Sequence, residues 1–459
     1  MYNIDFKNPV KVYFIGIGGI SMSGFAELLH SLKFSVTGSD RQKSKITDHL
    51  ESIGIKVFGE QVAENITPDI DLVVYTAAIH PDNPEFDAAK KMGLPMMERA
   101  ELVGQVMKNY KTAAAISGTH GKTTTTSMAS HVFLKAGLDP TISVGGILPV
   151  IGGNIRIGNS TNFITEACEY TNSFLKFYPT IGIILNIEED HMDFFHDIED
   201  IRASFRKFAE LLPDDGSLIV NADIDDHEKL FAGLGCSVIT YSIEGDANFT
   251  SKDIAYDECG HPSFDVYKDG SLLGRCTLAV PGLHNVGNAL ACIALSSVCG
   301  VDFKTACDAL TEFKGTNRRF EIKGKLNGFT IVDDYAHHPT EVKATIDVAK
   351  RYPHNELWIA FQPHTYTRTK AFLQNFADVL SEADHVILTD IYAAREPDPG
   401  DISSKDLADL LEKAGTDVTY LRSFDEAEKF ILKNLVNDDL LITMGAGNIV
   451  DIGEHLLKS

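Results

Sequence analysis

One loop in the sequence has the residue types that hold the phosphates of a nucleotide. The apolar run Thr112–Ser117 predicts a strand, the loop 118–124 reads Gly-Thr-His-Gly-Lys-Thr-Thr, and residues 123–137 predict a helix. Backbone N–H groups and the dipole at such a helix start face an anion, the Lys122 ammonium adds positive charge, and a threonine hydroxyl can join a Mg²⁺ shell. Ile116 stands where the common phosphate-loop pattern has its first glycine. A chance Gly-Lys-Thr turn is the alternative, but the flanking strand and helix favour phosphate binding.

Two further candidates for the same chemistry follow apolar runs that predict strands. Glu166 ends the run NFITE, and His191 comes shortly after IGIILNI. The carboxyl ends of strands are where α/β sheets present ligand groups, and Mg²⁺ prefers carboxylates, water and phosphates. Glu166 is therefore a candidate metal ligand. Residue type alone favours an ordinary hydrogen-bonded role for His191, and Asp190 and Asp193 are equally good candidates as ligands.

A second glycine-rich loop, Gly16–Ser21, follows the predicted strand Lys11–Ile15. Asp40 comes 22 residues after Gly18 (40 − 18). This spacing is close to the dinucleotide-binding fingerprint, in which glycines let the backbone approach a diphosphate and an acidic residue binds a ribose. Ser21 occupies the position of the third glycine. Taken alone, the loop predicts an NAD-dependent oxidoreductase.

Two more groups of polar residues could contact a nucleotide. His80 and Asn83 follow the apolar run Asp71–Ala78, although the segment HPDNPE is also an ordinary proline-rich turn. Three residues at a predicted helix start after Pro281-Gly282 can pair with an adenine edge or cap the helix, and residue types alone leave the two roles evenly balanced: His284, Asn285 and Asn288.

The last third of the chain has the best candidate for binding a carboxylate. Arg368 ends the run Gln-Pro-His-Thr-Tyr-Thr-Arg, and a planar guanidinium can form two parallel hydrogen bonds to a carboxylate. Four polar residues also crowd the end of the predicted strand FTIVDDYA, a pattern that favours a pocket over an apolar core: Asp334, Tyr335, His337 and His338.

These residues need a scaffold of strands that end together, and the whole chain predicts one. Short apolar, β-branched runs alternate with amphipathic helical stretches, which indicates parallel α/β sheets. At roughly 150 residues per domain, the 459 residues predict about three domains. The two glycine-rich strand–loop starts and the polar segment GTNRRFE place the domains at 1–110, 111–314 and 315–459.

Composition narrows the class of protein. The formal net charge is −24, which repels phosphate backbones, so we expect no nucleic-acid partner. The apolar runs are too short to cross a bilayer, and the N-terminus lacks the pattern of a signal peptide, so we expect no membrane insertion. The seven cysteines include no C-x-x-C pair, which is typical of a reducing compartment and predicts a cytoplasmic protein.

The loop at 118–124 resembles the ATP loop of the Mur ligase superfamily, the ATP-dependent, amide-forming enzymes of peptidoglycan precursor synthesis. Other motifs of that family occur in the same order along the chain, and the resemblance covers essentially all of it. These motifs are Glu166-Ala-Cys-Glu169, Asn186–Asp193, His284-Asn285-x-x-Asn288, Arg318-Arg319-Phe-Glu321, Asp333–Glu341 and Phe361–Thr369.

The resemblance implies three α/β domains and a particular reaction. A Rossmann-like N-terminal domain would bind a UDP-sugar, a central P-loop ATPase-like domain with a parallel sheet would bind ATP, and a C-terminal Rossmann-like domain would bind an amino acid. The implied reaction joins L-alanine to the carboxylate of UDP-N-acetylmuramate through an acyl phosphate. Three alternatives stay open here: a recycling ligase that adds a tripeptide to the same UDP-sugar, the oxidoreductase above, and a regulatory nucleotide-binding protein without catalysis.

The resemblance also implies roles for individual residues. Catalysis would rest on Lys122, Glu166 and His191. ATP would contact Gly118, Thr119, His120, Gly121, Lys122, Thr123, Thr124, His284, Asn285, Asn288, Arg319, Asp334 and His337. The UDP-sugar would contact Gly16, Gly18, Gly19, Ile20, Ser21, Asp40, His80 and Asn83. The amino acid would contact Tyr335, His338, His364 and Arg368. Two Mg²⁺ ions would be held by Thr123, Glu166 and His191. A monomer or a homodimer is expected.

The chain departs from the family pattern at several positions. Cys168 and Tyr170 replace the aspartate and serine of the usual Glu-Ala-Asp-Glu-Ser run, and Asn448 replaces a usual aspartate. Several sister ligases use a modified lysine after the metal motif, but the corresponding segment here reads Phe205-Arg206-Lys207, so the sequence does not predict whether a modified lysine is used.

Overall fold

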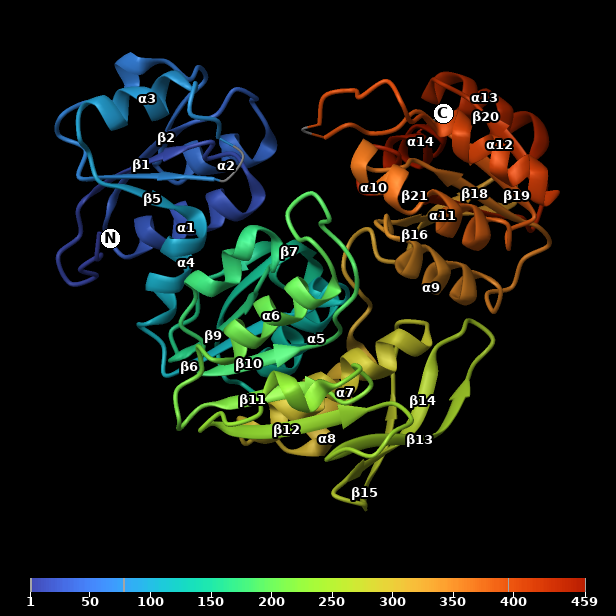
Figure 1. Cartoon of the computed structure of the whole chain (residues 1–459), viewed down its shortest axis with the longest axis horizontal. Helices are drawn as coiled ribbons and strands as arrows, with labels where there is room; N and C mark the ends of the chain where they lie inside the picture. Colours follow the sequence, from blue (N-terminus) through green and yellow to red (C-terminus); the bar gives the residue numbers. More distant parts are fainter. Residues whose placement is uncertain (1, 77–78, 395, 459) are drawn as a thin grey trace.

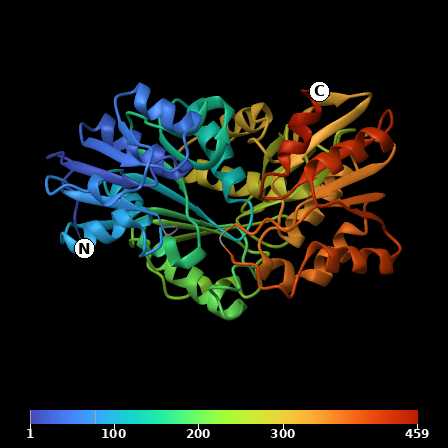
Figure 2. The same cartoon turned by 90° about the horizontal axis from the view of Figure 1, so that it is seen from above.

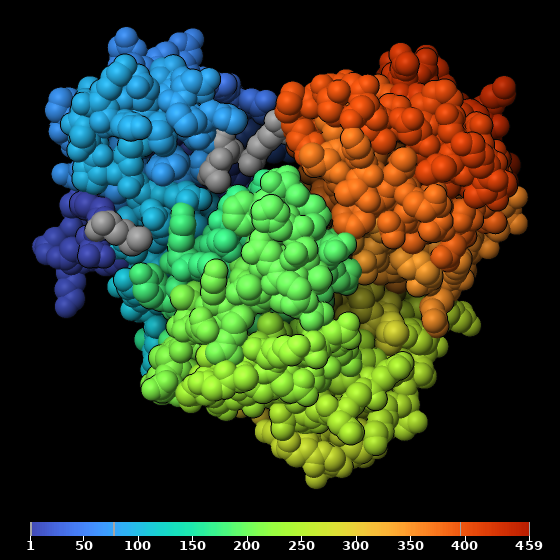
Figure 3. Space-filling model, viewed as in Figure 1, coloured from blue at the N-terminus to red at the C-terminus, as the bar shows by residue number. Residues whose placement is uncertain are grey.

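The computed structural model describes residues 2–76, 79–394 and 396–458. It has three α/β lobes built around a five-stranded, a ten-stranded and a six-stranded sheet, which confirms the predicted fold class. The N-terminal lobe (blue) and the C-terminal lobe (orange to red) stand side by side on the central lobe (green to yellow) in Figure 1, and Figure 2 shows the same three parts from above. A notch separates the two outer lobes in Figure 3. Among the described residues, no helix is long and apolar enough to cross a membrane.

The N-terminal lobe has a parallel sheet flanked by helices. Its elements are β1 (Lys11–Ile15), α1 (Ile20–Ser31), β2 (Ser35–Ser39), α2 (Lys45–Ser52), β3 (Lys56–Phe58), η1 (Ala63–Asn65), β4 (Leu72–Tyr75), α3 (Pro84–Lys91), β5 (Met96–Glu98) and α4 (Arg99–Met107). The strand order is β3-β2-β1-β4-β5. The strands β2 and β3 are thus added on one side of β1, and β4 and β5 on the other side. The loops after β1 and β4 therefore open a crevice at the carboxyl edge of the sheet. β4 is shorter than the predicted strand Asp71–Ala78, and Ala77 and Ala78 lie outside the described residues.

The central lobe has a mixed sheet rather than a purely parallel one. Its elements are β6 (Thr112–Ser117), α5 (Lys122–Lys135), β7 (Thr141–Leu148), η2 (Pro149–Ile151), β8 (Gly153–Arg156), β9 (Asn162–Glu166), η3 (Tyr170–Lys176), β10 (Ile181–Ile184), α6 (Ile198–Ala209), β11 (Ser217–Asn221), η4 (His227–Leu230), β12 (Ser237–Ser242), β13 (Phe249–Tyr256), β14 (Pro262–Lys268), β15 (Ser271–Thr277), α7 (Leu283–Val298) and α8 (Phe303–Glu312).

The strand order of this sheet explains both its parallel core and its antiparallel edges. The order is β15-β14-β13-β12-β11-β10-β6-β9-β7-β8, and every pair from β7 to β13 is parallel. The edge pairs β7–β8, β13–β14 and β14–β15 are antiparallel. Asp269 and Gly270, both at positive φ, form the two-residue turn between β14 and β15, which is the usual chemistry of a tight hairpin.

Register aligns the functional ends of three adjacent strands. Ile116 on β6 pairs with Glu166 on β9, and Ser117 pairs with Ile184 on β10. The phosphate loop, the Glu166 carboxylate and the segment that leads to His191 therefore leave the sheet at one edge.

The C-terminal lobe has a six-stranded sheet with helices on both faces. Its elements are β16 (Glu321–Leu326), β17 (Phe329–Asp334), α9 (Pro339–Ala349), β18 (Leu357–Phe361), α10 (Tyr366–Ala371), α11 (Leu373–Leu380), β19 (His385–Leu388), α12 (Ser404–Ala414), β20 (Asp417–Tyr420), α13 (Phe424–Asn434), β21 (Leu440–Met444) and α14 (Val450–Leu456). In the order β16-β17-β21-β18-β19-β20, only β16 is antiparallel to its neighbour. Asp334 and Phe361 both pair with Met444, so the polar segments that follow β17 and β18 meet at one edge.

Candidate active site

Lys122 is held by a carboxylate that the sequence motifs did not assign to it. Its Nζ lies 2.9 and 3.1 Å from the two carboxylate oxygens of Glu169 and also donates to the carbonyl oxygens of Gly118 and Thr119. The Glu169 side chain is only 3% exposed. Burial opposes the charge of Lys122, but Glu169 outweighs it and raises the pKa of Lys122 above its usual value. The lysine is therefore a fixed cation at the phosphate loop.

Gly121 forms the turn from which α5 begins. Its φ is +82°, and a Cβ at this position would lie 2.7 Å from Asn288 Oδ1 on α7. A larger residue here meets both backbone strain and a side chain of another helix. The glycine thus lets α7 approach the phosphate loop.

We expect Gly121→Ala to lower the free energy of unfolding by about 1–3 kcal/mol and to weaken ATP binding by at least about tenfold, because the loop must move away from Asn288. Calorimetry and ATP titration measure the two effects. Gly137→Ala is the matched control, since Gly137 has φ +70° at the other end of α5 and nothing within 4 Å of its Cβ position. Gly137→Ala should share the strain but leave ATP binding unchanged; equal ATP affinities of the two variants would contradict the prediction.

Glu166 is the last residue of β9, and its carboxylate lies against the backbone of β7. Its Oε1 accepts a hydrogen bond from Gly145 N at 2.5 Å, and a Cβ on Gly145 would lie 2.8 Å from Oε2. The next glycine, Gly146, lies against Thr123, with its Cβ position 3.2 Å from the Thr123 methyl group. Because these two residues of β7 have no side chain, the Glu166 carboxylate and the Thr123 side chain can both lie against the same stretch of β7 backbone.

His191 has an unusual backbone and is clamped by two neighbours. Its φ is +55°, and its ring stacks on Tyr170 with centroids 4.3 Å apart and planes 25° apart. The Tyr170 hydroxyl donates to Asp193 Oδ2 at 2.7 Å. His191 Nε2 lies 3.7 Å from Glu169 Oε1 and 3.8 Å from Asp190 Oδ2. Burial lowers the pKa of His191 below its usual value, so the neutral ring has a lone pair for a cation.

The donor set around Lys122 fits a hard divalent cation. Carboxylates and a threonine hydroxyl are the ligands that Mg²⁺ prefers, and a neutral imidazole can complete a shell. Asp193, one of the two aspartates that were alternatives to His191 as a ligand, instead accepts a hydrogen bond from Tyr170. Asp190, the other, is engaged by Arg368.

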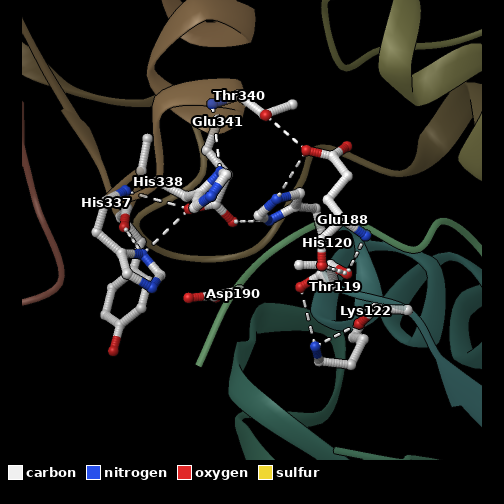
Figure 4. Close-up of polar contacts among 12 residues, drawn as sticks. Thr119, His120, Lys122, Glu188, Asp190, His337, His338, Thr340 and Glu341 are labelled. Carbon is white, nitrogen blue, oxygen red and sulfur yellow. Dashed lines mark hydrogen bonds and ion pairs between the residues drawn. The ribbon is translucent and has the colours of Figure 1, made fainter. Parts of the chain in front are cut away.

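A second cluster has metal-like geometry but is better explained as an ion pair between lobes. His120, Glu188 and His338 place ligand atoms within 4.8 Å of one another. His120 Nε2 lies 3.5 Å from Glu188 Oε2, and its Nδ1 lies 3.3 Å from Glu341 Oε1 (Figure 4). Burial opposes protonation of His120, yet the two glutamates outweigh it and raise the pKa of His120 to about 9. A protonated imidazole does not ligate a metal.

We expect this ion pair to make stability depend on pH. Because the pKa of His120 is raised from 6.5 to about 9, its contribution is complete below pH 6.5, declines as pH rises, and is lost above about pH 9. The melting temperature of the wild-type protein should therefore fall more steeply between neutral pH and pH 9 than that of His120→Asn. Identical slopes would show that His120 is not charged in the folded chain.

A cavity of about 270 Å³ lies between the central and C-terminal lobes, beside the phosphate loop. The walls include eight of the residues predicted to contact ATP: His120, Gly121, Thr124, His284, Asn285, Asn288, Arg319 and Asp334. Gly282 is the N-cap of α7, so Asn285 and Asn288 lie inside the helix and the capping alternative is wrong. Their amides instead bond to Pro281 O at 2.7 Å and to each other at 3.0 Å.

Charge is unevenly distributed around this cavity. Burial and the Arg319 cation lower the pKa of His284 to about 4, so this wall is neutral. Burial raises the pKa of Asp334 to about 6, although Arg319 and the backbone N–H groups of Phe320 and Ala336 oppose the shift. Arg319 is a second cation on the wall, beside protonated His120, and lies 3.8 Å from Glu341.

Arg368 joins the C-terminal lobe to the central lobe. Its Nε and Nη2 donate to Asp190 Oδ1 at 3.1 and 2.8 Å, and its Nη1 lies 3.2 Å from His364 Nδ1. Burial opposes the charge of Asp190, but Arg368 holds the pKa of that carboxyl well below its usual range. Burial, with His337 and Arg368, lowers the pKa of His364 to about 3, so the neutral ring accepts a hydrogen bond from Arg368.

The other predicted C-terminal residues do not line this cavity, and each of them has a structural partner. His338 caps α9 through Thr340 N at 3.4 Å and lies 3.1 Å from Glu189 O in the central lobe. His337 contacts Tyr335 O at 2.9 Å and Glu341 at 3.1 Å (Figure 4). Tyr335 lies under Arg319, whose guanidinium is 5.3 Å from its ring centroid.

A larger cavity of about 700 Å³ occupies the crevice of the N-terminal lobe. Seven of the residues predicted to contact a UDP-sugar line it: Gly16, Gly19, Ile20, Ser21, Asp40, His80 and Asn83. Gly18 is not part of the wall; its N–H donates to Asp40 Oδ2 at 2.9 Å, and a Cβ there would meet that carboxylate. Asn83 also caps α3 by accepting from Glu85 N and Phe86 N.

Sequence reasoning missed several residues of these sites. The walls of the N-terminal cavity also include Arg41, Gln42, Gln61 and Arg99, none of which belongs to a recognisable motif. Glu169, Glu188 and Glu341 occur in the quoted motifs, but their pairing with Lys122 and His120 has no local signal. The adjacent glycines Gly145 and Gly146 are a local signal that could have indicated the close approach of the β7 backbone to Glu166.

Comparison with known proteins gives one consistent result. Three family models match the chain: the Mur ligase family catalytic domain at 11–111, the Mur ligase middle domain at 116–296 and the Mur ligase glutamate ligase domain at 318–447. A UDP-N-acetylmuramate–L-alanine ligase of Lachnospira eligens is 57% identical over 459 residues, which cover 100% of both chains. The structure is similar to UDP-N-acetylmuramate–alanine ligase from Thermotoga maritima (TM-score 0.83, 31% identity, 98% of each chain) and to a murein peptide ligase from Psychrobacter arcticus (TM-score 0.74, 26% identity, 98% of each chain).

Proposed function

The chain belongs to the Mur ligase family, and we propose that it joins L-alanine to the carboxylate of UDP-N-acetylmuramate at the expense of ATP, as a step of peptidoglycan precursor synthesis. The observation that carries the proposal is full-length identity of 57% to a ligase of that specificity. The geometry agrees, because one cavity is lined by residues of the ATP loop and the other by residues of the N-terminal glycine loop. An NAD-dependent oxidoreductase would leave this arrangement without a role.

The proposed reaction has two steps. The carboxylate of UDP-N-acetylmuramate attacks the γ-phosphorus of ATP, the bond to the β,γ-bridging oxygen breaks, and an acyl phosphate and ADP result. The amine of L-alanine then attacks the acyl carbon, loses a proton, and the tetrahedral intermediate collapses to an amide and inorganic phosphate. Both reactants of the first step are anions, so positive charge along the line of transfer is the main requirement.

We assign that charge to this chain's own residues. Lys122, fixed by Glu169, would contact the transferred phosphate, and Arg319 would contact the nucleotide in the cavity beside it. Mg²⁺ bound by Glu166, His191 and Thr123, as two ions, would neutralise phosphate charge. Arg368 would hold the L-alanine carboxylate, and His364, Tyr335 and His338 would contact the amino acid in the same pocket. The crevice with Gly16–Ser21, Asp40, His80 and Asn83 would hold the UDP-sugar.

The remaining parts of the proposal concern organisation. We place the domains at 1–110, 111–314 and 315–459, and the protein in the cytoplasm as a monomer or a homodimer. Since the substrates are held by three lobes, closure of the lobes on bound substrates would gate the chemistry.

The test is phosphate release with ATP, Mg²⁺ and UDP-N-acetylmuramate, with and without L-alanine, followed by mass spectrometry of the product. We expect release only when both the UDP-sugar and L-alanine are present, together with a new amide. Release that ignores L-alanine but responds to the tripeptide would assign the recycling activity instead. ATP turnover without any acceptor would leave a nucleotide-binding protein.

A further inference from the structure

Arg99 is a cation at the junction of the N-terminal and central lobes. It is the first residue of α4, directly after β5, and it lines the N-terminal cavity. The position is rigid, because the preceding residue, Glu98, forms an ion pair with Lys176 of η3. The α4 backbone also lies against η3, where a Cβ on Gly104 would be 2.0 Å from Lys176 O. Arg99 is therefore held in place by both lobes.

The guanidinium of Arg99 lacks an anionic partner in the described part of the chain. Its recorded hydrogen bond runs from Nη1 to Ser21 Oγ at 3.2 Å, and none of the described carboxylates lies within 4.0 Å of it. Arginine has five N–H donors, and a partly buried charge without a counter-ion is costly. Burial lowers the pKa of Arg99 below its usual value, and the nearby Cys168, Glu98 and Glu166 oppose that shift only in part. The site thus offers a cation and several free donors to an anion that enters the cavity.

The UDP-sugar of the proposed reaction has two anionic groups that could meet this cation. The diphosphate has a separate site, because the first turn of α1, which follows the glycine loop, lines the same cavity and presents its backbone N–H groups and the helix dipole to it. The lactyl carboxylate has a stricter requirement, since it must reach the γ-phosphate of ATP at Lys122.

Arg99 lies where the N-terminal cavity meets the central lobe, because it begins α4, which packs on η3 of that lobe. Cys168 and Glu166, which follow and end β9, influence the charge of Arg99 and also that of Lys122. This short segment of the central lobe is therefore close to both cations. A carboxylate held by Arg99 would approach this segment from the UDP-sugar side, and the γ-phosphate at Lys122 would approach it from the other.

We propose that Arg99 binds the lactyl carboxylate of UDP-N-acetylmuramate and directs it toward the γ-phosphate of ATP. The inference rests on the proposed function. The planar guanidinium pairs with both carboxylate oxygens and neutralises one of the two anions that must meet. Arg99 stays protonated throughout, and Ser21 Oγ fixes its orientation. Ser21, which breaks the dinucleotide fingerprint, thereby has a function that a glycine could not perform.

The test compares two ligands that differ in the lactyl group. UDP-N-acetylmuramate has the carboxylate, whereas UDP-N-acetylglucosamine has the same diphosphate and lacks it. Isothermal titration without ATP measures the affinity of each ligand for the wild-type protein, Arg99→Gln and Arg99→Lys. We expect Arg99→Gln to weaken UDP-N-acetylmuramate binding by roughly ten- to a hundredfold and to change UDP-N-acetylglucosamine binding by less than about threefold. Arg99→Lys should regain part of the loss.

Arg41→Gln is the matched control, because it removes the same charge from an exposed position on the wall of the same cavity. It should change the affinities of the two ligands alike, and melting temperatures and ATP titrations show that each variant is folded. Equal weakening of both ligands by Arg99→Gln would assign the guanidinium to the diphosphate and overturn the inference, as would no weakening of either. A wild-type protein that binds neither UDP-sugar would instead overturn the proposed function.

Discussion

Replacing Lys122 with methionine is expected to reduce kcat/KM for amide formation by roughly 10³-fold or more, because the transferred phosphate loses the cation that the loop supplies. Binding of UDP-N-acetylmuramate should be unchanged, since its cavity lies in the N-terminal lobe. Steady-state kinetics and titration with the UDP-sugar measure the two quantities. Equal loss of both would contradict the assignment of the two ligands to separate lobes.

The same variant should also lose stability, and this effect can be separated from catalysis. Glu169 is 3% exposed and would be left as an unpaired buried carboxylate, at a cost of about 3–5 kcal/mol of unfolding free energy. The double variant Lys122→Met/Glu169→Gln should recover most of that stability and none of the activity. Lys135→Met is the control on the same helix, because its pair with Glu312 is exposed and contributes about 1 kcal/mol or less. Recovery of activity in the double variant would show that the lysine has only a structural role.

Replacing Arg368 with glutamine is expected to raise KM for L-alanine by roughly a hundredfold, because the amino-acid carboxylate loses a guanidinium with two parallel donors. The first half-reaction should persist, since the ATP loop and the UDP-sugar cavity are untouched. Steady-state kinetics with varied L-alanine give the first result, and trapping of the acyl phosphate with hydroxylamine gives the second. Lys370→Gln, also on α10 but paired with Asp401 at the surface, should leave both unchanged.

The partner of Arg368 makes the outcome specific. Asp190 is 8% exposed in its side chain and bonds to Arg368 from another lobe, so Arg368→Gln should also lower the melting temperature. Arg368→Gln/Asp190→Asn should restore stability while KM for L-alanine stays high. Loss of acyl-phosphate trapping in Arg368→Gln, with KM for L-alanine unchanged, would place Arg368 at the first step and contradict the proposed role.

Much of the fold and of the phosphate site follows from local sequence. The strand at 112–117, the glycine turn and the helix that begins at Lys122 are consecutive, so short-range pattern alone predicts them, and the structure has them as β6 and α5. The N-terminal glycine loop is equally local. The antiparallel edges of the central sheet were not predicted, although Asp269-Gly270 is a hairpin signal that could have indicated one of them.

Tertiary structure alone decided which charges meet. Lys122 pairs with Glu169, 47 residues away, and Arg368 pairs with Asp190, 178 residues away. Residues so far apart in the chain form no local sequence pattern, so neither pair could be predicted. The absence of a described carboxylate beside Arg99 depends in the same way on how α4 lies against the central lobe. Sequence determines local elements because their hydrogen bonds join near neighbours in the chain. Partners across lobes depend on the packing of whole sheets and helices, so only the folded structure shows which buried charges are neutralised and which remain available to a substrate.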